Sequence, residues 1–400
     1  MSKNHLIHLV SHPVQYYTPL YARIAADKDI DFLVLYCSKK GLEKTHDVEF
    51  GVSVQWDLPL LDGYAYKFLK NHAWHESLDH LMGLFNCGII KEIAAAPKQS
   101  VIWIHGWNYA THLLAVFVGK LYGHRVFMRG DNTAVIEMKE PNTLKKRFKK
   151  LWFSRCFFPL IDKFLAVGNQ NKAFFQLFGV PDHKIEMALH CIDNQRFIQQ
   201  SGILKSQKKG LREALGIPLS KTVLIISGKY IEKKRPLDLL RAMTLLPKDA
   251  DVFAIFVGEG KLRAEMEQFI CEHHLTDKVL LTGFINQSLM PNYYAVSDIY
   301  VMCSGMWETW GLSTNEALCF GLPVILSDMV GSAYDLIDGN GFMYPSGDVQ
   351  ALAQYLQYFL LLPEKEFQTK RDNSRCLIER YQYENVVSAI KSAVINPHNN

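Results

Sequence analysis

The sequence lacks the paired cysteines that mark a zinc site or a disulfide framework. Its eight cysteines are scattered, and none forms a Cys-x-x-Cys pair. This pattern fits a reducing environment such as the cytosol. Long apolar runs are also missing: the longest, residues 113–118, is far below the roughly 20 residues that a membrane-spanning helix needs. The first residues lead directly into an apolar run without a signal-peptide layout, so we expect a cytoplasmic protein.

A large excess of one sign of charge is missing as well. Charged residues make up 21% of the chain and the formal net charge is +4, so composition alone does not indicate a nucleic-acid partner. A chain of 400 residues is longer than one hydrophobic core usually serves. We therefore expect at least two globular domains.

Strand-forming runs alternate with helix patterns along most of the chain. In the first half the predicted strands are residues 6–10, 32–36, 101–104, 125–128 and 164–168. In the second half they are residues 223–227, 252–257, 279–282, 299–302 and 324–327. Repeated β-α units with short links predict an α/β fold with two doubly wound, parallel-sheet, Rossmann-like domains, which we expect to face a central cleft.

A polar stretch separates the two series of strands. Residues 196–215 contain the run Lys-Ser-Gln-Lys-Lys-Gly, and we interpret them as an irregular domain junction. The last pattern, at residues 372–394, is helical and is followed by no strand. We place the domains at residues 1–200 and 201–375, and expect residues 376–400 to pack back on the first domain as a helix.

Two glutamates bracket the loop that follows the predicted strand 299–302. Ligands of open α/β sheets bind beyond the carboxyl ends of the strands, so this loop lies where a nucleotide would bind. Glu316 can also close a capping box begun by Ser313, and a capping role and a ligand role can coexist. Glu308 lies between two tryptophans, where a carboxylate is either solvated or used, and we interpret it as a ligand-binding group.

Glycines and lysines follow the other strands of the second half. Gly228 and Lys229 come directly after one strand, and Lys234 lies in a basic run shortly afterwards. Glycine lets a ligand approach the backbone, and lysines supply charge for a diphosphate. The alternative is a plain turn followed by a solvated basic run. Gly258 and Gly283 end the next two strands and allow the same choice between a ligand-facing turn and a plain turn.

The ordered set of these motifs resembles a known family. It comprises Gly228-Lys229 with Lys234, Gly-Glu-Gly at 258–260, Gly283-Phe284, Glu308 to Glu316, Gly-Leu-Pro-Val at 321–324 and Gly-Asn-Gly-Phe at 339–342. The set is similar to the C-terminal domain of the family 4 (group 1) retaining glycosyltransferases, which have the GT-B fold. The first half of the chain is similar to that family mainly in its strand-helix rhythm.

The resemblance implies a donor site for a nucleotide sugar, and a UDP-sugar more than a GDP-sugar. Lys229, where the family usually has arginine, and Lys234 would hold the diphosphate. Glu308 would contact the transferred sugar, and Glu316 would accept hydrogen bonds from the ribose. The remaining donor-site residues implied are Gly228, Gly258, Phe284, Ile285, Trp310, Gly311, Leu312 and Ser313. Of these, Phe284 and Ile285 would line the base pocket, and the amides from Trp310 to Leu312 would face the phosphates and the sugar.

The first half of the chain supplies candidates for the acceptor side. His12 and Gln15 lie in the loop after the first strand, which lacks the glycines usual for the family. His12 is either a functional substitute or a turn residue. Arg129 and Asp131 follow the strand 125–128, where they would face the cleft or form a local ion pair. His105 follows the strand 101–104.

The predicted catalytic residues are Glu308, Lys234, His105 and Asp131. A departing nucleoside diphosphate gains negative charge, which two lysines and helix-start amides can neutralise. The sequence has no Asp-x-Asp motif, so we expect no metal and no cofactor besides the nucleotide-sugar co-substrate. Lys234 is followed by Arg235, where the family usually has glycine.

A basic segment at residues 144–155 has six cationic side chains and no acid. Leu144, Phe148, Leu151 and Trp152 fall on one helical face. This pattern is typical of an interfacial helix on an anionic membrane. A helix that faces the core with a solvated basic side explains the same pattern, but we favour membrane contact because an acceptor on a lipid carrier would require it. A nucleic-acid partner is not indicated by one short run.

We predict a metal-independent, retaining hexosyltransferase that acts on a saccharide or lipid-linked saccharide in bacterial-type surface polysaccharide or glycan biosynthesis. It would be cytoplasmic, with the basic segment as its candidate contact to the inner face of the membrane. The alternative is a non-catalytic sugar-nucleotide-binding or scaffold protein with the same fold, against which the presence of Lys234, Glu308 and Glu316 argues. A Rossmann oxidoreductase is disfavoured because no Gly-x-Gly-x-x-Gly follows the first strand.

Overall fold

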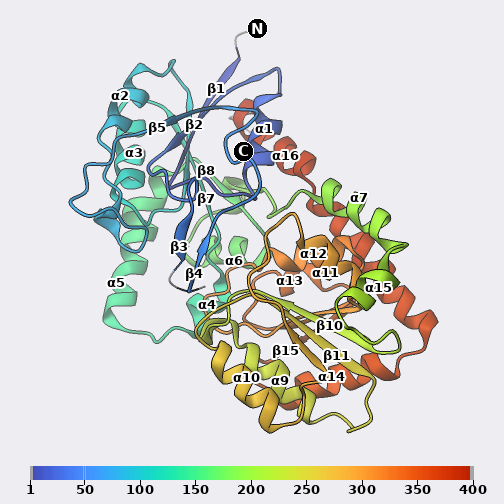
Figure 1. The fold of residues 1–400 in the computed structure, drawn as a ribbon. Coiled ribbons are helices and arrows are strands. Elements are labelled where there is room, and N and C mark those ends of the chain that lie inside the picture. Colours follow the sequence, from blue (N-terminus) through green and yellow to red (C-terminus); the bar gives the residue numbers. More distant parts are fainter. Residues whose placement is uncertain (1–2, 48, 50, 397–400) are drawn as a thin grey trace. The chain divides into compact units, whose positions relative to one another are not determined.

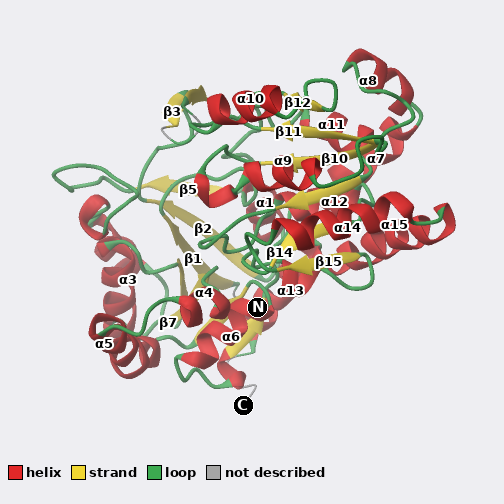
Figure 2. Cartoon of the chain, turned by 90° about the horizontal axis from the view of Figure 1, so that it is seen from below, coloured by secondary structure: helices red, strands yellow, loops and turns green. Residues whose placement is uncertain are grey.

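The protein divides into two compact units in a computed structural model that describes residues 3–47, 49 and 51–396. The first unit comprises residues 1–43, 59–190 and 383–400. The second comprises residues 44–58 and 191–382. Figure 1 follows the chain by colour, and Figure 2 shows that helices flank the strands of each unit.

The first unit is built around a parallel sheet with the strand order β5-β2-β1-β6-β7-β8-β9. Its strands are β1 (Asn4–Val10), β2 (Ile30–Tyr36), β5 (Ala65–Phe68), β6 (Val101–His105), β7 (Arg125–Gly130), β8 (Lys163–Ala166) and β9 (Ile185–Met187). Its helices are α1 (Thr18–Ala25), α2 (Gly88–Ala95), α3 (Ala110–Leu121), α4 (Ala134–Lys139), α5 (Leu144–Trp152), α6 (Asn169–Leu177) and α16 (Tyr383–Ile395). The central strands are buried on both faces because helices cover both, as their apolar sequences require.

The second unit has a parallel sheet with the order β12-β11-β10-β13-β14-β15. Its strands are β10 (Thr222–Ser227), β11 (Val252–Val257), β12 (Val279–Leu281), β13 (Ile299–Met302), β14 (Val324–Ser327) and β15 (Gly341–Tyr344). Its helices are α7 (Asn194–Lys205), α8 (Lys208–Ala214), α9 (Pro236–Thr244), α10 (Arg263–Glu272), α11 (Met290–Val296), α12 (Ser313–Cys319), α13 (Ala333–Leu336), α14 (Val349–Leu361) and α15 (Glu364–Ile378). The strand order reverses at β10, between β11 and β13, which is the switch point where ligands of such sheets bind.

The expected irregular junction at residues 196–215 is wrong, because α7 and α8 occupy it. The Asp193 side chain caps α7 by accepting from the Arg196 amide. Phe197 and Leu204 supply the buried side of the helix. In α8 the buried Arg212 pairs with Asp298 at 2.6 Å. Tertiary partners therefore order a stretch whose own composition is polar.

The single C-terminal helix expected at residues 372–394 is two helices, α15 and α16, separated by a 3₁₀ turn at Glu379–Tyr381. The helix α15 belongs to the second unit and α16 to the first. Within the first unit, α16 is fixed beside α1. The Tyr383 hydroxyl donates to the Tyr16 carbonyl at 2.8 Å, and Glu384 pairs with Arg23 at 3.2 Å.

A short antiparallel hairpin interrupts the first unit in sequence but belongs to the second. It consists of β3 (Thr45–Asp47) and β4 (Val52–Val54) within residues 44–58. The domain boundaries placed from the sequence do not assign this hairpin to the second domain. Its partners in the second unit are more than 170 residues away along the chain, so no local pattern shows them.

Candidate functional site

Two glycines bring the strand ends of the second unit together at the switch point. Gly228 follows β10 with a φ of +152°, and Gly258 follows β11 with a φ of +154°. A Cβ atom on Gly258 would lie 1.9 Å from the Gly228 carbonyl oxygen. Only glycine at position 258 permits this approach of one loop to the other, and Gly228, which is half-buried, lies beside the switch point.

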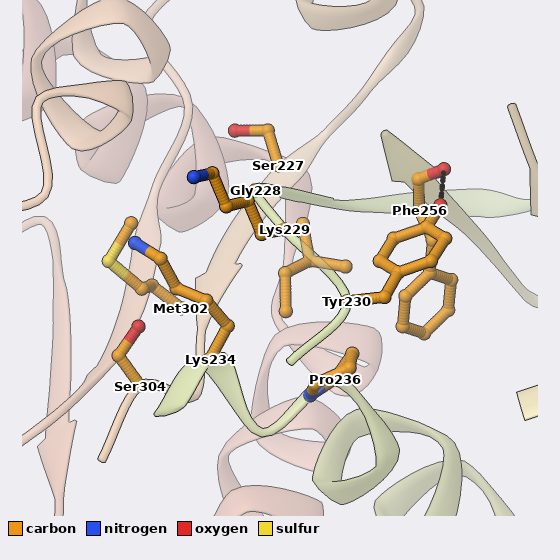
Figure 3. A pocket seen from close by; sticks show the side chains of 10 residues that line it. Ser227, Gly228, Lys229, Tyr230, Lys234, Pro236, Phe256, Met302 and Ser304 are labelled. Carbon is orange, nitrogen blue, oxygen red and sulfur yellow. Dashed lines mark hydrogen bonds between the residues drawn. The ribbon is translucent and has the colours of Figure 1, made fainter. Parts of the chain in front are cut away.

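The loops after β10 and β13 line a pocket with about 270 Å³ of empty space. Its wall includes Gly228, Lys229, Lys234, Met302 and Ser304 (Figure 3). In this view the ammonium groups of both lysines point toward the same side of the pocket. The two lysines predicted to bind the diphosphate therefore lie on one wall, together with the turn at Gly228.

Lys234 forms an ion pair with Glu308 through carboxylate oxygen Oε2. The Ser304 hydroxyl donates to the same oxygen at 3.0 Å. Glu308 is only 6% exposed, and burial alone would raise its pKa. The charge and hydrogen bond of Lys234, with smaller contributions from Lys233 and Ser304, together outweigh burial and hold the pKa of Glu308 below its usual value. Glu308 is thus an ionised carboxylate in a buried, charge-balanced position.

Both partners of this pair adjoin residues with left-handed backbone. Among the described residues, four non-glycine positions have a positive φ, and Arg235 (+49°) and Trp307 (+76°) are two of them. Arg235 stands where the related family usually has glycine, which would adopt this conformation without strain. An ion pair with Asp238 at 2.6 Å holds Arg235 in place. Such strain is often retained beside functional groups.

Glu316 lies on α12, almost completely buried, with hydrogen bonds to both carboxylate oxygens. Gln287 Nε2 donates to Oε1 at 2.6 Å, and the Tyr294 hydroxyl donates to Oε2 at 2.7 Å. The predicted capping box is wrong: the N-cap of α12 is Leu312 and makes no side-chain capping bond. The Ser313 hydroxyl instead contacts Tyr300 at 2.6 Å. The carboxylate of Glu316 is held by tertiary contacts and not by the helix start.

The loop between the two glutamates has mixed roles. Gly311 has a φ of +89°, and a Cβ there would meet the Met302 sulfur at 2.7 Å, so a larger residue would push into the pocket wall. Trp310 is 4% exposed and donates from Nε1 to Asn315 at 2.9 Å. Its ring is therefore part of the core. Leu312 and Ser313 are half-buried at the start of α12.

The hairpin of residues 44–58 reaches the predicted diphosphate and base residues. Lys229 Nζ lies 3.0 Å from Asp47 Oδ2 and 2.6 Å from Glu49 Oε2. The ring of Phe284 lies 6.3 Å from that of Trp56, centroid to centroid. Phe284 and the adjacent Ile285 are half-buried.

Sequence reasoning missed Ser304, Tyr294 and Gln287. Ser304 follows the end of β13, so the rule that located the other residues at strand ends would have included it. Tyr294 on α11 and the preceding Gln287 act only through Glu316, which no sequence pattern indicates. The acids of the hairpin gave no signal, because their lysine partner is about 180 residues away.

The first unit gathers histidines and an arginine at the ends of β6 and β7. His105 and Arg129 are paired neighbours in the sheet. Arg129 is 1% exposed and donates from Nη2 to the Leu189 carbonyl at 3.3 Å. Its Nε and Nη1 have no hydrogen-bond partner in the described part of the chain, so a hydrogen-bonded pair with Asp131 is not seen. Burial and the charge of Arg129 lower the pKa of His105 to about 3.

The two candidates after β1 are differently placed. His12 is half-buried and contacts the Ser11 hydroxyl through Nδ1 at 2.9 Å. Burial, assisted by the charge of Lys40, lowers its pKa to about 4. Gln15 is 6% exposed. Both histidines, His12 and His105, are therefore neutral near pH 7 and can accept or donate hydrogen bonds without carrying charge.

The basic helix α5 does not face the core. Leu144 is 82% exposed, Phe148 72% and Leu151 55%, whereas Trp152 stacks on Phe157 at 5.2 Å. The alternative of a core-facing helix is therefore wrong for three of the four apolar residues. Lys146 and Lys149 both pair with Glu137. This one acid balances only part of the positive charge of the helix.

No helix of the described residues is long and apolar enough to cross a membrane. In the same part of the chain, no cluster of three or more His, Cys, Asp or Glu side chains is arranged as a metal site.

Each unit has an all-parallel, Rossmann-like sheet whose strand order reverses at one strand, β1 in the first unit and β10 in the second. Two such domains define the GT-B class of fold. Residues 207–375 match the family described as glycosyl transferases group 1. The match covers the part of the chain that carries the motifs, and it confirms the resemblance inferred from them.

Curated relatives agree with this assignment. The amylovoran biosynthesis glycosyltransferase AmsK of Erwinia amylovora is 30% identical over 197 residues, 47% of each chain. The UDP-Gal:alpha-D-GlcNAc-diphosphoundecaprenol alpha-1,3-galactosyltransferase of Escherichia coli is 23% identical and covers 65% of this chain and 66% of its own. The chain spans about half the length of most of the curated relatives it matches.

Solved structures show the same fold along the whole chain. A glycosyltransferase from Rickettsia africae has a TM-score of 0.76 at 14% identity and covers 100% of both chains. Anabaena HepE in complex with UDP has a TM-score of 0.72 at 16% identity, with 98% of this chain and 99% of its own covered.

Proposed function

We propose that the protein is a retaining hexosyltransferase that takes its sugar from a UDP-sugar. The observation that carries the proposal is the pocket at the β10 switch point, where Lys229 and Lys234 lie on one wall and Glu308 is held ionised beside them. UDP as the nucleotide is supported by the fold relative whose structure contains UDP and by the relative named for UDP-Gal.

The chemistry follows from the charges at the pocket. Breaking the bond between sugar and diphosphate builds negative charge on the departing phosphate, and fixed ammonium groups stabilise that charge without reorganising. Lys234 would exchange part of its contact with Glu308 for the phosphate. Glu308 could then accept hydrogen bonds from sugar hydroxyls. This arrangement requires no metal ion.

Glu316 would hold the ribose. Gln287 and Tyr294 donate to its two oxygens, and a carboxylate oxygen can accept more than one hydrogen bond, including one from a ribose hydroxyl. Gln287 and Tyr294 fix the carboxylate so that little side-chain entropy remains to be lost on binding. Phe284 and Ile285 would border the base.

The acceptor is proposed to be a saccharide or lipid-linked saccharide of bacterial-type surface polysaccharide, as the names of the relatives suggest. In the first unit, His12, Gln15 and Arg129 are the proposed acceptor-side residues, and His105 and Asp131 are proposed to assist catalysis. The neutral histidines could hydrogen-bond sugar hydroxyls at any pH above about 5, since their pKa values are about 3 and 4.

A lipid-linked acceptor would bring the protein to the inner face of a membrane, and α5 is the proposed contact. Its exposed Leu144, Phe148 and Leu151 would enter the interface, while Lys145 and Lys150 would meet anionic headgroups. The charge-reversal variant Lys145→Glu/Lys150→Glu should lose binding to vesicles with anionic lipid. If the parent protein does not sediment with such vesicles, the membrane proposal fails.

The donor assignment is tested by UDP binding and by turnover. UDP should raise the melting temperature of the protein by mass action. Lys234→Gln should weaken UDP binding, whereas Lys233→Gln, which changes the exposed neighbouring lysine, should change it much less. Release of UDP from a panel of UDP-hexoses, with and without saccharide acceptors, then measures transfer. Nucleotide binding without any turnover would favour a non-catalytic binding protein instead.

Glu316→Ala separates ligand binding from stability. It should weaken UDP binding more than it lowers the melting temperature. Unchanged UDP affinity in this variant would remove Glu316 from the donor site.

A further inference from the structure

The hairpin of residues 44–58 is attached to the second unit at the predicted donor pocket. Asn286 Nδ2 donates to the Gln55 carbonyl at 2.7 Å, and the Ser288 amide donates to Asp57 at 3.2 Å. Trp56 lies against Phe284. These contacts place the base of the hairpin beside residues proposed to border the nucleotide base.

The other limb of the hairpin brings two carboxylates to one lysine. Asp47 and Glu49 lie within 3.0 Å and 2.6 Å of Lys229 Nζ. A nucleoside diphosphate presents the same chemistry, since it also places paired negative oxygens against a cation.

We propose that Asp47 and Glu49 act as an internal competitor of the donor diphosphate for Lys229. The hairpin neutralises the lysine when the pocket is empty, and a bound diphosphate must displace both carboxylates. The hairpin thereby sets the donor affinity of the pocket. This inference rests on the proposed function, because Lys229 is a diphosphate ligand only if the pocket binds a nucleotide sugar.

The test compares UDP affinity, by calorimetry, in the parent and in Asp47→Asn/Glu49→Gln. Both acids are partly solvated, with side chains 33% and 60% exposed. Removing their competition should therefore tighten UDP binding by about three- to tenfold. Glu43→Gln/Asp62→Asn is the matched control, because it removes the same charge at exposed positions just outside the hairpin and should leave the affinity unchanged.

The outcomes are distinguishable. If the parent binds UDP and the double variant binds it equally or more weakly, the competition is refuted while the donor assignment stands. If the control tightens binding as much as the double variant, the effect is one of net charge and the specific role is refuted. If neither protein binds UDP, the proposed function falls and this inference falls with it.

A second cavity in the same unit carries an independent inference. It has about 430 Å³ of empty space and is lined by four cationic side chains, Lys205, Lys208, Arg371 and Arg375. Asp298 pairs with Lys208 at 2.8 Å and with Arg371 at 2.9 Å, but it is also the partner of Arg212. One carboxylate thus serves three cations, and Arg375 has a separate partner in Asp372 at 3.2 Å, so the five cations in and beside the cavity share two acids.

Two further features of the cavity are a guanidinium N–H of Arg371 and the side chain of Tyr294, which contacts Glu316. Arg371 Nε is buried and has no hydrogen-bond partner within the described ranges. The wall includes Tyr294, whose hydroxyl donates to Glu316. Excess positive charge with an unsatisfied guanidinium donor is suited to an anion with several acceptor oxygens.

We propose that this cavity binds a phosphate group, independently of the donor pocket. Titration with inorganic phosphate in the presence of excess UDP should show a site that Lys205→Gln/Arg375→Gln weakens at least about fivefold, by loss of charged hydrogen bonds. Lys209→Gln/Lys365→Gln removes the same charge from exposed positions on α8 and α15 that do not line the cavity. No phosphate binding by the parent at millimolar concentration, or equal loss in both variants, would refute the site.

Discussion

At the strand ends of the second unit, lysines are paired with carboxylates, whereas at those of the first unit a buried arginine lies among neutral histidines. Lys229 and Lys234 each have an acid beside them. Arg129 donates to a backbone carbonyl, and its charge helps to lower the pKa of His105. The second unit can therefore exchange one anion for another. The first offers a hydrogen-bonding surface whose charge does not change near neutral pH.

The largest expected effect breaks a pair in the second unit. Lys234→Ala would leave Glu308 ionised, buried and without its ammonium partner, which should lower the free energy of unfolding by about 3–5 kcal/mol. Urea denaturation measures this change. Lys234→Ala/Glu308→Gln removes the stranded charge and should recover part of the loss. Equal stability of the single variant and the parent would show that the pair is not charge-balanced in solution.

A smaller effect concerns the first unit and pH. Burial lowers the pKa of His105 to about 3 and that of His112 to about 4, whereas an unfolded histidine titrates near 6.5. Between these values the unfolded chain binds more protons, so stability is complete above about pH 6.5 and falls as the pH drops. At pH 5 each histidine should cost about 2 kcal/mol.

Hydrogen exchange at pH 7 and pH 5 localises that loss, after correction for intrinsic rates. Amides of β6 and α3 should lose protection, while those of β10 and β13 keep theirs. Glu308 does not oppose this expectation, because its lowered pKa keeps it ionised at pH 5. Equal loss in both units would remove the contrast between them.

The smallest expected effect concerns Tyr294, an uncharged hydrogen-bond partner of Glu316 in the second unit. Tyr294→Phe removes one hydrogen bond to the carboxylate of Glu316 and should cost about 1.5 kcal/mol. Tyr300→Phe removes a bond between two hydroxyl groups and should cost about 1 kcal/mol or less. Thermal unfolding of both variants tests the order, and only Tyr294→Phe should also weaken UDP binding.

Most of the sheet of the second unit was predictable from the sequence because its strands are buried on both faces. Residues 252–257, 299–302 and 324–327 were predicted as strands and are β11, β13 and β14. Uninterrupted apolar runs between turns leave little choice of structure. The pocket lysines and Glu308 were located by the same reasoning, since they follow strand ends.

Features that depend on distant partners were not predictable. The sequences of α7 and α8 are polar, and the acid that pairs with Arg212 is Asp298, 86 residues later in the chain. No local pattern therefore indicates that these helices form. The capping box around Ser313 was a sound local pattern, but Tyr300, Tyr294 and Gln287 offered better partners to its members. The acids of the hairpin meet their lysine only after both segments have folded.

The position of α16 has a consequence for synthesis. The first unit begins at the first strand, yet its helix layer beside α1 is completed only by residues that follow the whole second unit in sequence. Arg125 in β7 likewise donates to the Ala393 carbonyl at 3.3 Å. The emerging chain must therefore hold an incomplete apolar surface on this unit while the whole of the second unit is made. Shortening the chain by its last helix should expose that surface permanently and make the protein dependent on chaperones.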